Sequence, residues 1–242
     1  MRTATIILAA GKGTRMQSDQ PKVIFELAGK AMVNRVIETA NKIDSEKIIV
    51  VVGYKKEQVK AVIGNQANIL YAVQEPQLGT GHAVMVCKEH LADFEGIVFI
   101  LYGDVPMLKG QTLKRMLDIH TKESAVCTVL TAKMPDPLQY GRIVRDENGG
   151  FVKIAEFKDA SEQERLINEI NTGIYCYNAA ELRESLKELN NDNKQGEYYL
   201  TDTLEILRKK GNHISSVILD DIAEASGVNS VEQLKELEKQ VD

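Results

Sequence analysis

The chain has 242 residues, of which 43% are hydrophobic, so one large domain with a buried core is expected. Its net charge of −5 argues against a general nucleic-acid-binding surface or an anionic-membrane surface. Cys87, Cys127 and Cys176 form no C-x-x-C pair, so neither a disulfide framework nor a zinc site is expected. No stretch approaches the roughly 20 apolar residues of a membrane span, and a cytoplasmic location without membrane or nucleic-acid partners is expected.

The first half of the chain alternates short apolar strands with amphipathic helical segments. Strands are expected at residues 4–9, 47–52, 69–73 and 97–101, and helices at residues 31–42, 55–63, 79–91 and 109–122. This alternation is typical of a parallel sheet with helices on both faces.

After residue 122 the pattern changes to strands separated by turn residues such as Asn148-Gly149-Gly150. Strands are expected at residues 125–133, 141–145, 151–156, 171–177 and 213–219, and helices at residues 179–189, 198–210 and 231–241. The pattern predicts an antiparallel or mixed extension that holds a second substrate. We interpret residues 1–242 as a single domain, with a nucleotide-binding half (1–122) and a substrate-binding half (123–242).

A glycine loop with fixed cations follows the first strand. Gly11 and Gly13 allow backbone N–H groups to approach an anion, and Lys12, Arg15 and Lys22 bring positive charge to the same place. The loop therefore predicts a phosphate site. The alternative is a solvated basic turn after a core strand.

The glycine loop departs from two common phosphate-binding motifs. In the dinucleotide fingerprint G-x-G-x-x-G the third glycine would stand at Met16, and Pro21 interrupts the helix that the fingerprint requires. The second strand is followed by Gly53, where that fold needs an acidic residue for the ribose. No G-x-x-x-x-G-K-[S/T] spacing occurs either. A nicotinamide-dependent oxidoreductase and a P-loop enzyme are therefore excluded.

Polar residues also follow the third and fourth strands, and ligands of open parallel sheets bind at such strand ends. Gln74, with Gly79 and Gly81 after it, offers an amide that can read the edge of a base such as uracil. The alternative for Gln74 is a surface side chain that ends a strand. Asp104 suits Mg²⁺, which takes one or two protein oxygens as ligands. The alternative role for Asp104 is to cap the helix at 109–122.

The second half of the chain adds polar groups beside glycines. Tyr140-Gly141-Arg142, Glu156 and the run 169–173 place carboxylate and amide groups next to glycine backbone. Such groups suit the vicinal hydroxyls of a sugar, each of which both donates and accepts hydrogen bonds. Ordinary turn or strand-edge residues explain each of these positions about as well.

An ordered set of motifs covers nearly the whole chain: LAAGKGTRM…PK, QLGTGHA, YGDVP, YGRI, EINTG, QGEYYLTD and GVN. The set resembles the N-terminal uridyltransferase domain of the bifunctional N-acetylglucosamine-1-phosphate uridyltransferase/glucosamine-1-phosphate acetyltransferase family and, more widely, the sugar-nucleotide pyrophosphorylases. The resemblance implies a GT-A-like (Rossmann-like) α/β fold, with a mixed, mostly parallel sheet flanked by helices and a small β-rich sugar-binding extension. It also implies Mg²⁺-dependent uridylyl transfer from UTP to N-acetylglucosamine 1-phosphate, which gives UDP-N-acetylglucosamine and pyrophosphate.

The resemblance further implies roles for individual residues. Arg15, Lys22 and Asp104 would be catalytic, with Arg15 facing the departing pyrophosphate, and Asp104 and Asn229 would ligate Mg²⁺. The substrate-binding residues would be Leu8, Ala9, Ala10, Gly11 and Lys22 for the nucleotide and phosphates, Gln74, Gly79 and Thr80 for uracil, and Tyr102, Gly103, Asp104, Gly141, Glu156, Asn171 and Asn229 for ribose, sugar and phosphates. The role of Asn229 rests on the resemblance alone, because the sequence 227–229 otherwise looks like a helix N-cap.

The chain departs from the family at two places. The family continues into a left-handed β-helix that carries acetyl transfer and trimerisation, whereas this sequence ends at Asp242. We therefore expect either an excised domain or a naturally single-function enzyme, assign it no acetyl transfer and leave the oligomeric state open. Phe157 stands where the family often has histidine after the sugar-site glutamate, and little effect is expected from it.

Two alternative functions remain at this point. One is a pyrophosphorylase for another sugar 1-phosphate or another base. The other is a catalytically silent regulatory subunit that binds sugar nucleotides, against which the presence of Arg15, Lys22, Asp104 and Asn229 argues.

Overall fold

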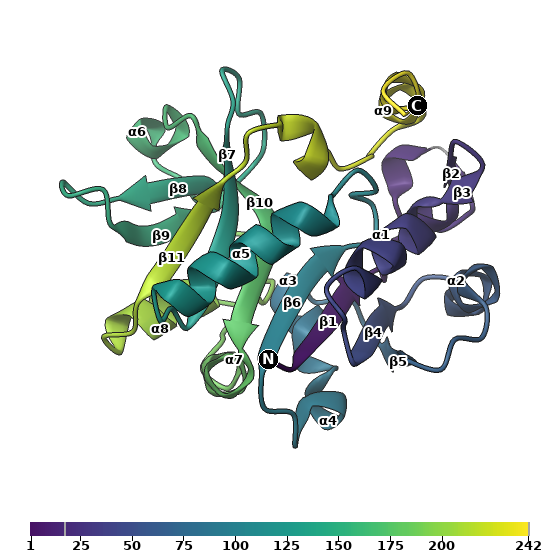
Figure 1. Ribbon diagram of the computed structural model, residues 1–242. Helices are drawn as coiled ribbons and strands as arrows, with labels where there is room; N and C mark the ends of the chain where they lie inside the picture. Colours follow the sequence, from purple (N-terminus) through teal and green to yellow (C-terminus); the bar gives the residue numbers. More distant parts are fainter. Residues whose placement is uncertain (17, 242) are drawn as a thin grey trace.

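The computed structural model describes residues 1–16 and 18–241; Gln17 and Asp242, which belong to the predicted domain, lie outside the described residues. Nine strands form one sheet, with the order β11-β7-β10-β6-β1-β4-β5 and a hairpin, β8-β9, that continues from β10 (Figure 1). The predicted mixed, mostly parallel sheet flanked by helices is confirmed. The division of the chain into two halves of one domain stays a prediction.

The strand bounds follow the apolar runs of the sequence. The strands are β1 (Thr3–Leu8), β2 (Glu26–Leu27), β3 (Lys30–Ala31), β4 (Lys47–Val52), β5 (Ile69–Val73), β6 (Ile97–Tyr102), β7 (Cys127–Lys133), β8 (Arg142–Arg145), β9 (Phe151–Ala155), β10 (Glu169–Asn178) and β11 (Ile214–Ile218). The short strands β2 and β3 form a separate hairpin.

The helices lie between these strands and after the last of them. They are α1 (Met32–Asn41), α2 (Lys56–Ile63), α3 (Thr80–Met85), α4 (Lys88–Leu91), α5 (Gly110–Lys122), α6 (Glu162–Arg165), α7 (Ala179–Leu186), α8 (Asp202–Lys209) and α9 (Val231–Glu238). Short 3₁₀ turns occupy Thr14–Met16, Lys22–Ile24 and Ile222–Ala225.

Four parallel strands, β5, β4, β1 and β6, form the part of the sheet that comes from the first half of the chain. Nearly all residues of β1, β4 and β6 are buried, which is the pattern of strands covered on both faces. Because these strands are parallel, their carboxyl ends lie at one edge of the sheet, and the loops that follow them meet there.

Helices cover both faces of the sheet. Helices α1, α2 and α5 pack on one face through apolar side chains such as Val36, Val59 and Leu113 (Figure 1). Helices α3, α4, α7 and α8 pack on the other face through side chains such as Val84 and Leu204. This two-sided burial explains why the central strands are apolar runs rather than alternating patterns.

One strand, β10, runs against the direction of its neighbours. It pairs antiparallel with β6 and β7, and β11 returns parallel to β7. The register of β10 and β7 shifts between Asn171 and Tyr175. This irregularity changes the direction of the β10 side chains where the strand approaches the carboxyl end of β6.

Two local predictions from the sequence are wrong, and one hairpin was not predicted. The helix expected at 198–210 begins only at Asp202, because the backbone of residues 198–200 bonds to the loop at 78–81. The helix expected at 79–91 is two helices, α3 and α4, and between them Cys87 N bonds to Val84 O as in a 3₁₀ turn. The hairpin β2-β3 was not predicted, because its turn requires Ala28 at a positive φ of 48°, which few residues other than glycine adopt.

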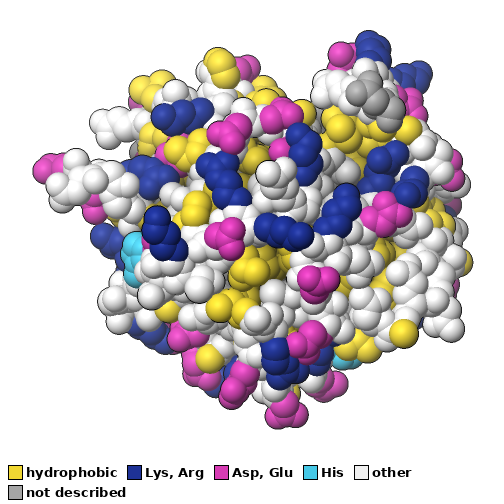
Figure 2. Space-filling model, in the orientation of Figure 1, with side chains coloured by type: hydrophobic (Ala, Val, Ile, Leu, Met, Phe, Trp, Pro, Cys, Tyr) yellow, Lys and Arg dark blue, Asp and Glu magenta, His cyan; other side chains and the backbone are white. Residues whose placement is uncertain are grey.

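The C-terminal helix α9 packs against the loop that follows β1. Leu234 and Leu237 of α9 join Met16, Leu27 and Met32 in a small apolar cluster. In Figure 2 apolar side chains lie below α9, at the upper right, where the helix meets the β2-β3 hairpin. The last residues of the described chain are therefore anchored to its opening loop.

None of the helices in residues 1–16 and 18–241 is long and apolar enough to cross a membrane. On the face drawn in Figure 2, Lys and Arg side chains alternate with Asp and Glu side chains, without a continuous basic surface.

The burial of His120 predicts that the free energy of unfolding depends on pH. It is 2% exposed between α5 and the sheet, where its ring nitrogens bond to Thr128 Oγ1 at 3.0 Å and Asn178 Oδ1 at 3.1 Å. Burial lowers the pKa of His120 below its ordinary value of 6.5. The unfolded chain therefore binds this proton more tightly, and the free energy of unfolding should fall as pH falls below the ordinary pKa and through the lowered one.

Urea unfolding at about pH 7.5 and about pH 5 measures this effect. His120→Gln should cost about 1–3 kcal/mol at the higher pH, because Thr128 and Asn178 lose a partner. The variant should also lose less stability than the wild type on acidification. An equal loss in the two proteins would contradict the role of His120.

Candidate active site

The loops that follow β1, β4, β5 and β6 meet at the carboxyl edge of the sheet. Ala10 O accepts hydrogen bonds from Tyr54 N at 3.1 Å and from the amide of Gln77. Gly103 N donates to Leu8 O at 3.0 Å. The convergence of strand-end loops that the sequence predicts is therefore present.

Two glycines of the opening loop differ in their surroundings. A Cβ at Gly13 would come within 2.5 Å of Lys22 Cβ, and Gly13 has a φ of 66°, so the fold itself requires glycine there. A Cβ at Gly11 would meet no heavy atom of the described chain within 4 Å. The space beside Gly11 is open, which fits a loop whose backbone is approached by a ligand.

Two cations, a carboxylate and an amide lie together beside this loop. The Lys22 ammonium forms an ion pair with Asp104 and donates to Asn229 Oδ1 at 2.9 Å. Arg15 Nη2 donates to the same oxygen at 2.9 Å. Asp104 does not cap α5, so that alternative is wrong, because its carboxylate is directed at Lys22. The residues that the resemblance named as catalytic and metal-binding are thus in contact.

The backbone on either side of Asn229 fixes its position. Val228 is buried in the α9 cluster, and its N–H donates to Asp104 O at 3.0 Å. The helix N-cap is Ser230, whose hydroxyl accepts from Gln233 N, and Gln233 Oε1 accepts from Asn229 N at 2.7 Å. Asn229 is therefore not the N-cap, and its side chain is free to bond to the two cations.

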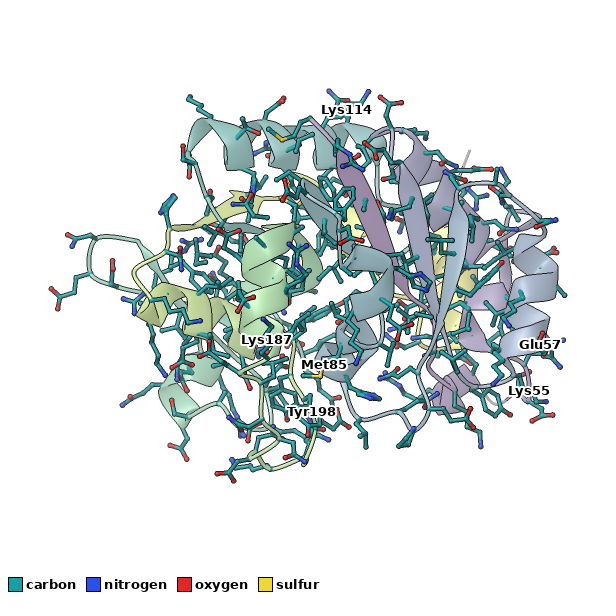
Figure 3. The ribbon with its side chains drawn as sticks, turned by 90° about the horizontal axis from the view of Figure 1, so that it is seen from below. Lys55, Glu57, Met85, Lys114, Lys187 and Tyr198 are labelled. Atoms are coloured by element: carbon teal, nitrogen blue, oxygen red, sulfur yellow. The ribbon has the colours of Figure 1, made fainter. Side chains whose placement is uncertain are left out.

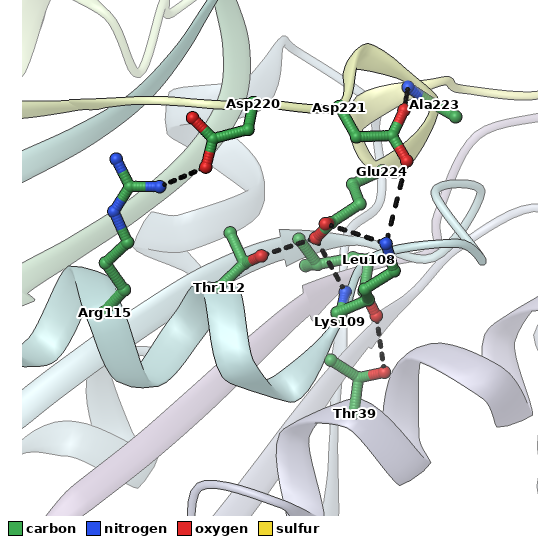
Figure 4. Close-up of polar contacts among 9 residues, drawn as sticks. All are labelled: Thr39, Leu108, Lys109, Thr112, Arg115, Asp220, Asp221, Ala223 and Glu224. Atoms are coloured by element: carbon green, nitrogen blue, oxygen red, sulfur yellow. Dashed lines mark hydrogen bonds and ion pairs between the residues drawn. The ribbon is translucent and has the colours of Figure 1, made fainter.

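A buried acid, Glu224, secures the segment that leads to Asn229. Glu224 Oε2 accepts from Lys109 N at 3.2 Å and from the Thr112 hydroxyl, and Oε1 pairs with the Lys109 ammonium at 3.2 Å (Figure 4). It thereby caps the N-terminus of α5, where Lys109 supplies no side-chain cap of its own. The neighbouring pair of Arg115 with Asp220 is exposed.

A cleft of about 610 Å³ opens beside the four-residue cluster. Among the predicted site residues, those that line it are Arg15, Thr80, Tyr102, Asp104, Gly141, Glu156, Asn171 and Asn229. The others do not line it: Leu8, Ala9, Ala10, Gly11, Lys22, Gln74, Gly79 and Gly103. Of these, Lys22 pairs with Asp104 of the lining, and Gln74 bonds to Gly79, which precedes Thr80 of the lining.

The lining of the cleft also carries fixed polar groups. The bulge in β10 presents Asn171, whose amide exchanges hydrogen bonds with the hydroxyl of Tyr175 at 2.7 and 3.0 Å. Glu156 accepts from Thr201 Oγ1 at 2.9 Å, and burial raises the pKa of Glu156 above its ordinary value. These groups have hydrogen-bonding capacity left for a polyhydroxyl ligand.

Gln74 is buried and not a surface side chain, so that alternative is wrong. Its Nε2 donates to Gly79 O at 2.9 Å, which fixes the loop after β5. Gly79 and Gly81 lie against the backbone of Tyr198, where a Cβ on either would come within 2.9 Å or less of the Tyr198 carbonyl oxygen. Figure 3 shows Tyr198 near Met85 of α3, the helix that this loop begins. These two glycines therefore serve packing within the protein.

A buried arginine holds one wall of the cleft. Arg142 is 2% exposed, and its guanidinium donates to Leu138 O at 3.0 Å and to Tyr140 O. The Phe157 ring lies 5.6 Å from Arg142 Cζ and 4.9 Å from Arg165 Cζ. The phenylalanine that departs from the family pattern thus packs between two guanidinium groups.

Sequence reasoning gave no individual role to several residues of the cleft. These are Val105, Leu138, Gln139, Tyr140, Thr172, Gly173, Tyr175, Gln195, Glu197, Tyr199, Thr201, Ala225, Gly227 and Gln233. Many belong to the motifs YGRI, EINTG and QGEYYLTD, which were the available signal.

The oxygen donors of the cluster suit a hard metal ion. No group of three or more His, Cys, Asp or Glu side chains in the described ranges is placed to hold a metal. The oxygens of Asp104 and Asn229 nevertheless share one cation, the Lys22 ammonium. Hard oxygen donors already arranged around a cation fit Mg²⁺, which completes its shell with water and phosphate.

Comparisons with known proteins show the family of the chain. A nucleotidyl transferase family model matches residues 4–223. The bifunctional protein GlmU of Caldanaerobacter subterraneus subsp. tengcongensis is 48% identical over 97% of this chain and 50% of its own length. That of Clostridium novyi is 46% identical over 99% of this chain and 52% of its own length. The chain therefore spans about half the length of the curated relatives it matches.

A solved structure shares the fold. The crystal structure of a UDP-glucose pyrophosphorylase complexed with UDP-glucose superposes with a TM-score of 0.80. The alignment covers 99% of this chain and 98% of that chain at 19% sequence identity. At this identity the likeness concerns the fold.

The two loop glycines give a paired prediction. Gly13→Ala should cost about 1–3 kcal/mol in the free energy of unfolding, because it places a Cβ at positive φ against Lys22. Gly11→Ala should change stability by less than about 0.5 kcal/mol, because its Cβ meets open space, yet weaken the binding of a nucleoside triphosphate about tenfold. Denaturant titration and calorimetry with nucleoside triphosphates measure the two effects. Unchanged nucleotide affinity in Gly11→Ala would contradict a phosphate-binding loop.

Glu224 gives a second prediction. Glu224→Ala should lower the free energy of unfolding by about 1–2 kcal/mol, because α5 loses its cap and Lys109 loses a partner. Asp220→Ala is the matched control: it removes a nearby exposed acid and should change stability by less than about 0.5 kcal/mol. Thermal and urea denaturation compare the variants, and equal stabilities would contradict the capping role.

Proposed function

The chain belongs to the nucleotidyl transferase family, and we propose that it transfers a uridylyl group from UTP to N-acetylglucosamine 1-phosphate, with release of pyrophosphate. The observation that carries the proposal is the convergence of Arg15 and Lys22 on Asn229 beside Asp104. A centre of fixed cations at the ends of parallel strands suits a reaction in which two phosphorylated substrates must meet.

The reaction is a displacement at phosphorus. A phosphate oxygen of the sugar phosphate attacks the α-phosphorus of UTP, and a new phosphorus–oxygen bond forms. The bond from the α-phosphorus to the bridging oxygen of the β-phosphate breaks, and pyrophosphate leaves with that electron pair. The attacking oxygen is already ionised near neutral pH, so no side chain has to remove a proton from it. Catalysis then consists of positioning and charge neutralisation.

The chain's own cations carry out that neutralisation. Arg15 would bind the departing pyrophosphate, and Lys22 would bind the phosphates that are being joined. Both side chains are held by Asn229, which limits the reorganisation needed when charge develops. The open space at Gly11 lets the backbone of the same loop approach these phosphates.

The remaining predicted residues are given the roles that the resemblance implies. Leu8, Ala9 and Ala10 would line the nucleotide and phosphate site. Gln74, Gly79 and Thr80 would hold uracil on the loop after β5. The ribose, the sugar and their phosphates would be bound by Tyr102, Gly103, Asp104, Gly141, Glu156, Asn171 and Asn229. The fixed amide of Asn171 and the carboxylate of Glu156 support the assignment of the sugar to this part of the cleft.

Asp104 and Asn229 would hold Mg²⁺, which fits their oxygen donors. When bound, the ion would supply additional neutralisation of phosphate charge. In the structure Lys22 contacts both of these residues, and Arg15 contacts Asn229.

The choice of substrates rests on the motifs QLGTGHA, EINTG and QGEYYLTD, which match the uridyltransferase domain of the bifunctional enzymes. The relatives that carry the name bifunctional protein GlmU agree with this choice. A structure of the same fold was solved with UDP-glucose, which is itself a uridine diphosphate sugar. No second activity is proposed for these 242 residues.

Pyrophosphate release with Mg²⁺, measured across a set of nucleoside triphosphates and sugar 1-phosphates, tests the proposal. The highest rate is expected for UTP with N-acetylglucosamine 1-phosphate. A maximum at another pair would replace the proposed substrates by those of a different pyrophosphorylase. No release with any pair would indicate a catalytically silent subunit.

Two variants test the assignment of the site. Asp104→Ala and Arg15→Ala should each lower kcat by a factor on the order of 10² or more, because each removes charge that the reaction uses. Circular dichroism and denaturation should show an intact fold in both. Near-normal turnover in both variants would place the reaction elsewhere.

A further inference from the structure

We propose that the Lys22 ammonium competes with the divalent cation for the oxygens of Asp104 and Asn229. Entry of the metal displaces Lys22, and the displaced ammonium then binds the phosphates of the nucleotide. The proposal rests on the proposed function for the identity of those phosphates. Lys22 thereby couples metal binding to triphosphate binding.

The first argument is the position of the ammonium. Lys22 Nζ contacts Asp104 Oδ2 and lies 2.9 Å from Asn229 Oδ1, so one cation joins the two candidate metal ligands. The side chains of Lys22 and Asp104 are only 15% and 14% exposed. A partly desolvated ion pair is stronger than a surface pair, so a second cation that binds the same carboxylate oxygen competes with the first.

The second argument is the charge of the cluster. Asn229 Oδ1 is a neutral amide oxygen, yet it accepts from both Arg15 and Lys22. In the described part of the chain no carboxylate pairs with Arg15, and Asp104 compensates only Lys22. A divalent cation added beside these two would increase the repulsion unless Lys22 moves away or an anion enters.

The third argument is the mobility that the geometry allows. The base of the Lys22 side chain is fixed, because Gly13 packs directly on its Cβ and Pro21 precedes it at the start of a 3₁₀ turn. The four-carbon stem beyond that point is flexible, and a lysine head group can turn while its stem stays packed. The open space at Gly11, in the same loop, is the place where the proposed phosphates would receive the ammonium.

The test is metal binding by the protein alone. Mn²⁺, in the absence of UTP and sugar phosphate, is titrated into the full chain, and free Mn²⁺ is followed by electron paramagnetic resonance. Lys22→Met should bind Mn²⁺ about tenfold more tightly than the wild type, because the competing ammonium is absent. Lys22→Gln is a second neutral variant, for use if Lys22→Met folds poorly. It should also bind Mn²⁺ more tightly than the wild type.

Two further variants make the result specific. Lys12→Met removes the same charge from the same loop, but Lys12 lies over the Tyr54 ring, 5.3 Å from its centroid, and not between the two oxygens. It should tighten Mn²⁺ binding by less than about twofold. Asp104→Asn should abolish the tight binding when it is added to Lys22→Met.

The outcomes separate this proposal from the proposed function. The competition is refuted if Lys22→Met and Lys22→Gln bind Mn²⁺ no more tightly than Lys12→Met does. It is also refuted if they bind Mn²⁺ more weakly than the wild type does. Either result holds even if the wild type releases pyrophosphate from UTP. The same holds if Mn²⁺ binds none of the variants. If the affinity rises as expected while no substrate pair releases pyrophosphate, the competition stands and the proposed function fails.

Discussion

The site depends on the contact between Asn229 and the two cations of the opening loop. This contact joins residues 214 and 207 positions apart in the chain, so it exists only when both ends of the fold are in place. It is secured by two residues that precede Asn229: Val228 packs in the α9 cluster with Met16, and Glu224 ties the segment further upstream to α5. The binding of a ligand to the loop therefore also depends on the packing of the C-terminal segment.

The glycines of this chain show how one residue type serves different physical needs. Gly13 and Gly79 are required by the protein, since each has positive φ and lies against its own backbone or the base of a side chain. Gly11 meets no such constraint in the described chain. The contrast separates a loop glycine that shapes the fold from one whose open side faces the proposed phosphate site, and sequence spacing alone does not distinguish them.

The sequence predicted the parts of the fold that depend on local pattern. Apolar runs located the parallel strands, and the rule that ligands gather at strand ends was enough to place Asp104 beside the opening loop. The rest depends on tertiary contact. Glu224 resembles any surface acid until α5 is packed beside it, Ala28 gives no sign of its positive φ, and Asn229 lies in a stretch that resembles a helix cap. Only the resemblance to a family could name Asn229, because nothing local to it indicates the distant cations.

The cleft is charged unequally along its length, and this inequality has a consequence for the orientation of a ligand. Arg15 and Lys22 outnumber the single carboxylate of Asp104 at one end. Elsewhere in the lining, burial raises the pKa of Glu156 above its ordinary value. Raised carboxyl pKa values mark a region that disfavours further negative charge. Under the proposed function, a sugar phosphate would therefore enter with its phosphate toward the glycine loop and its hydroxyls toward Glu156, the orientation that brings the attacking oxygen to the nucleotide.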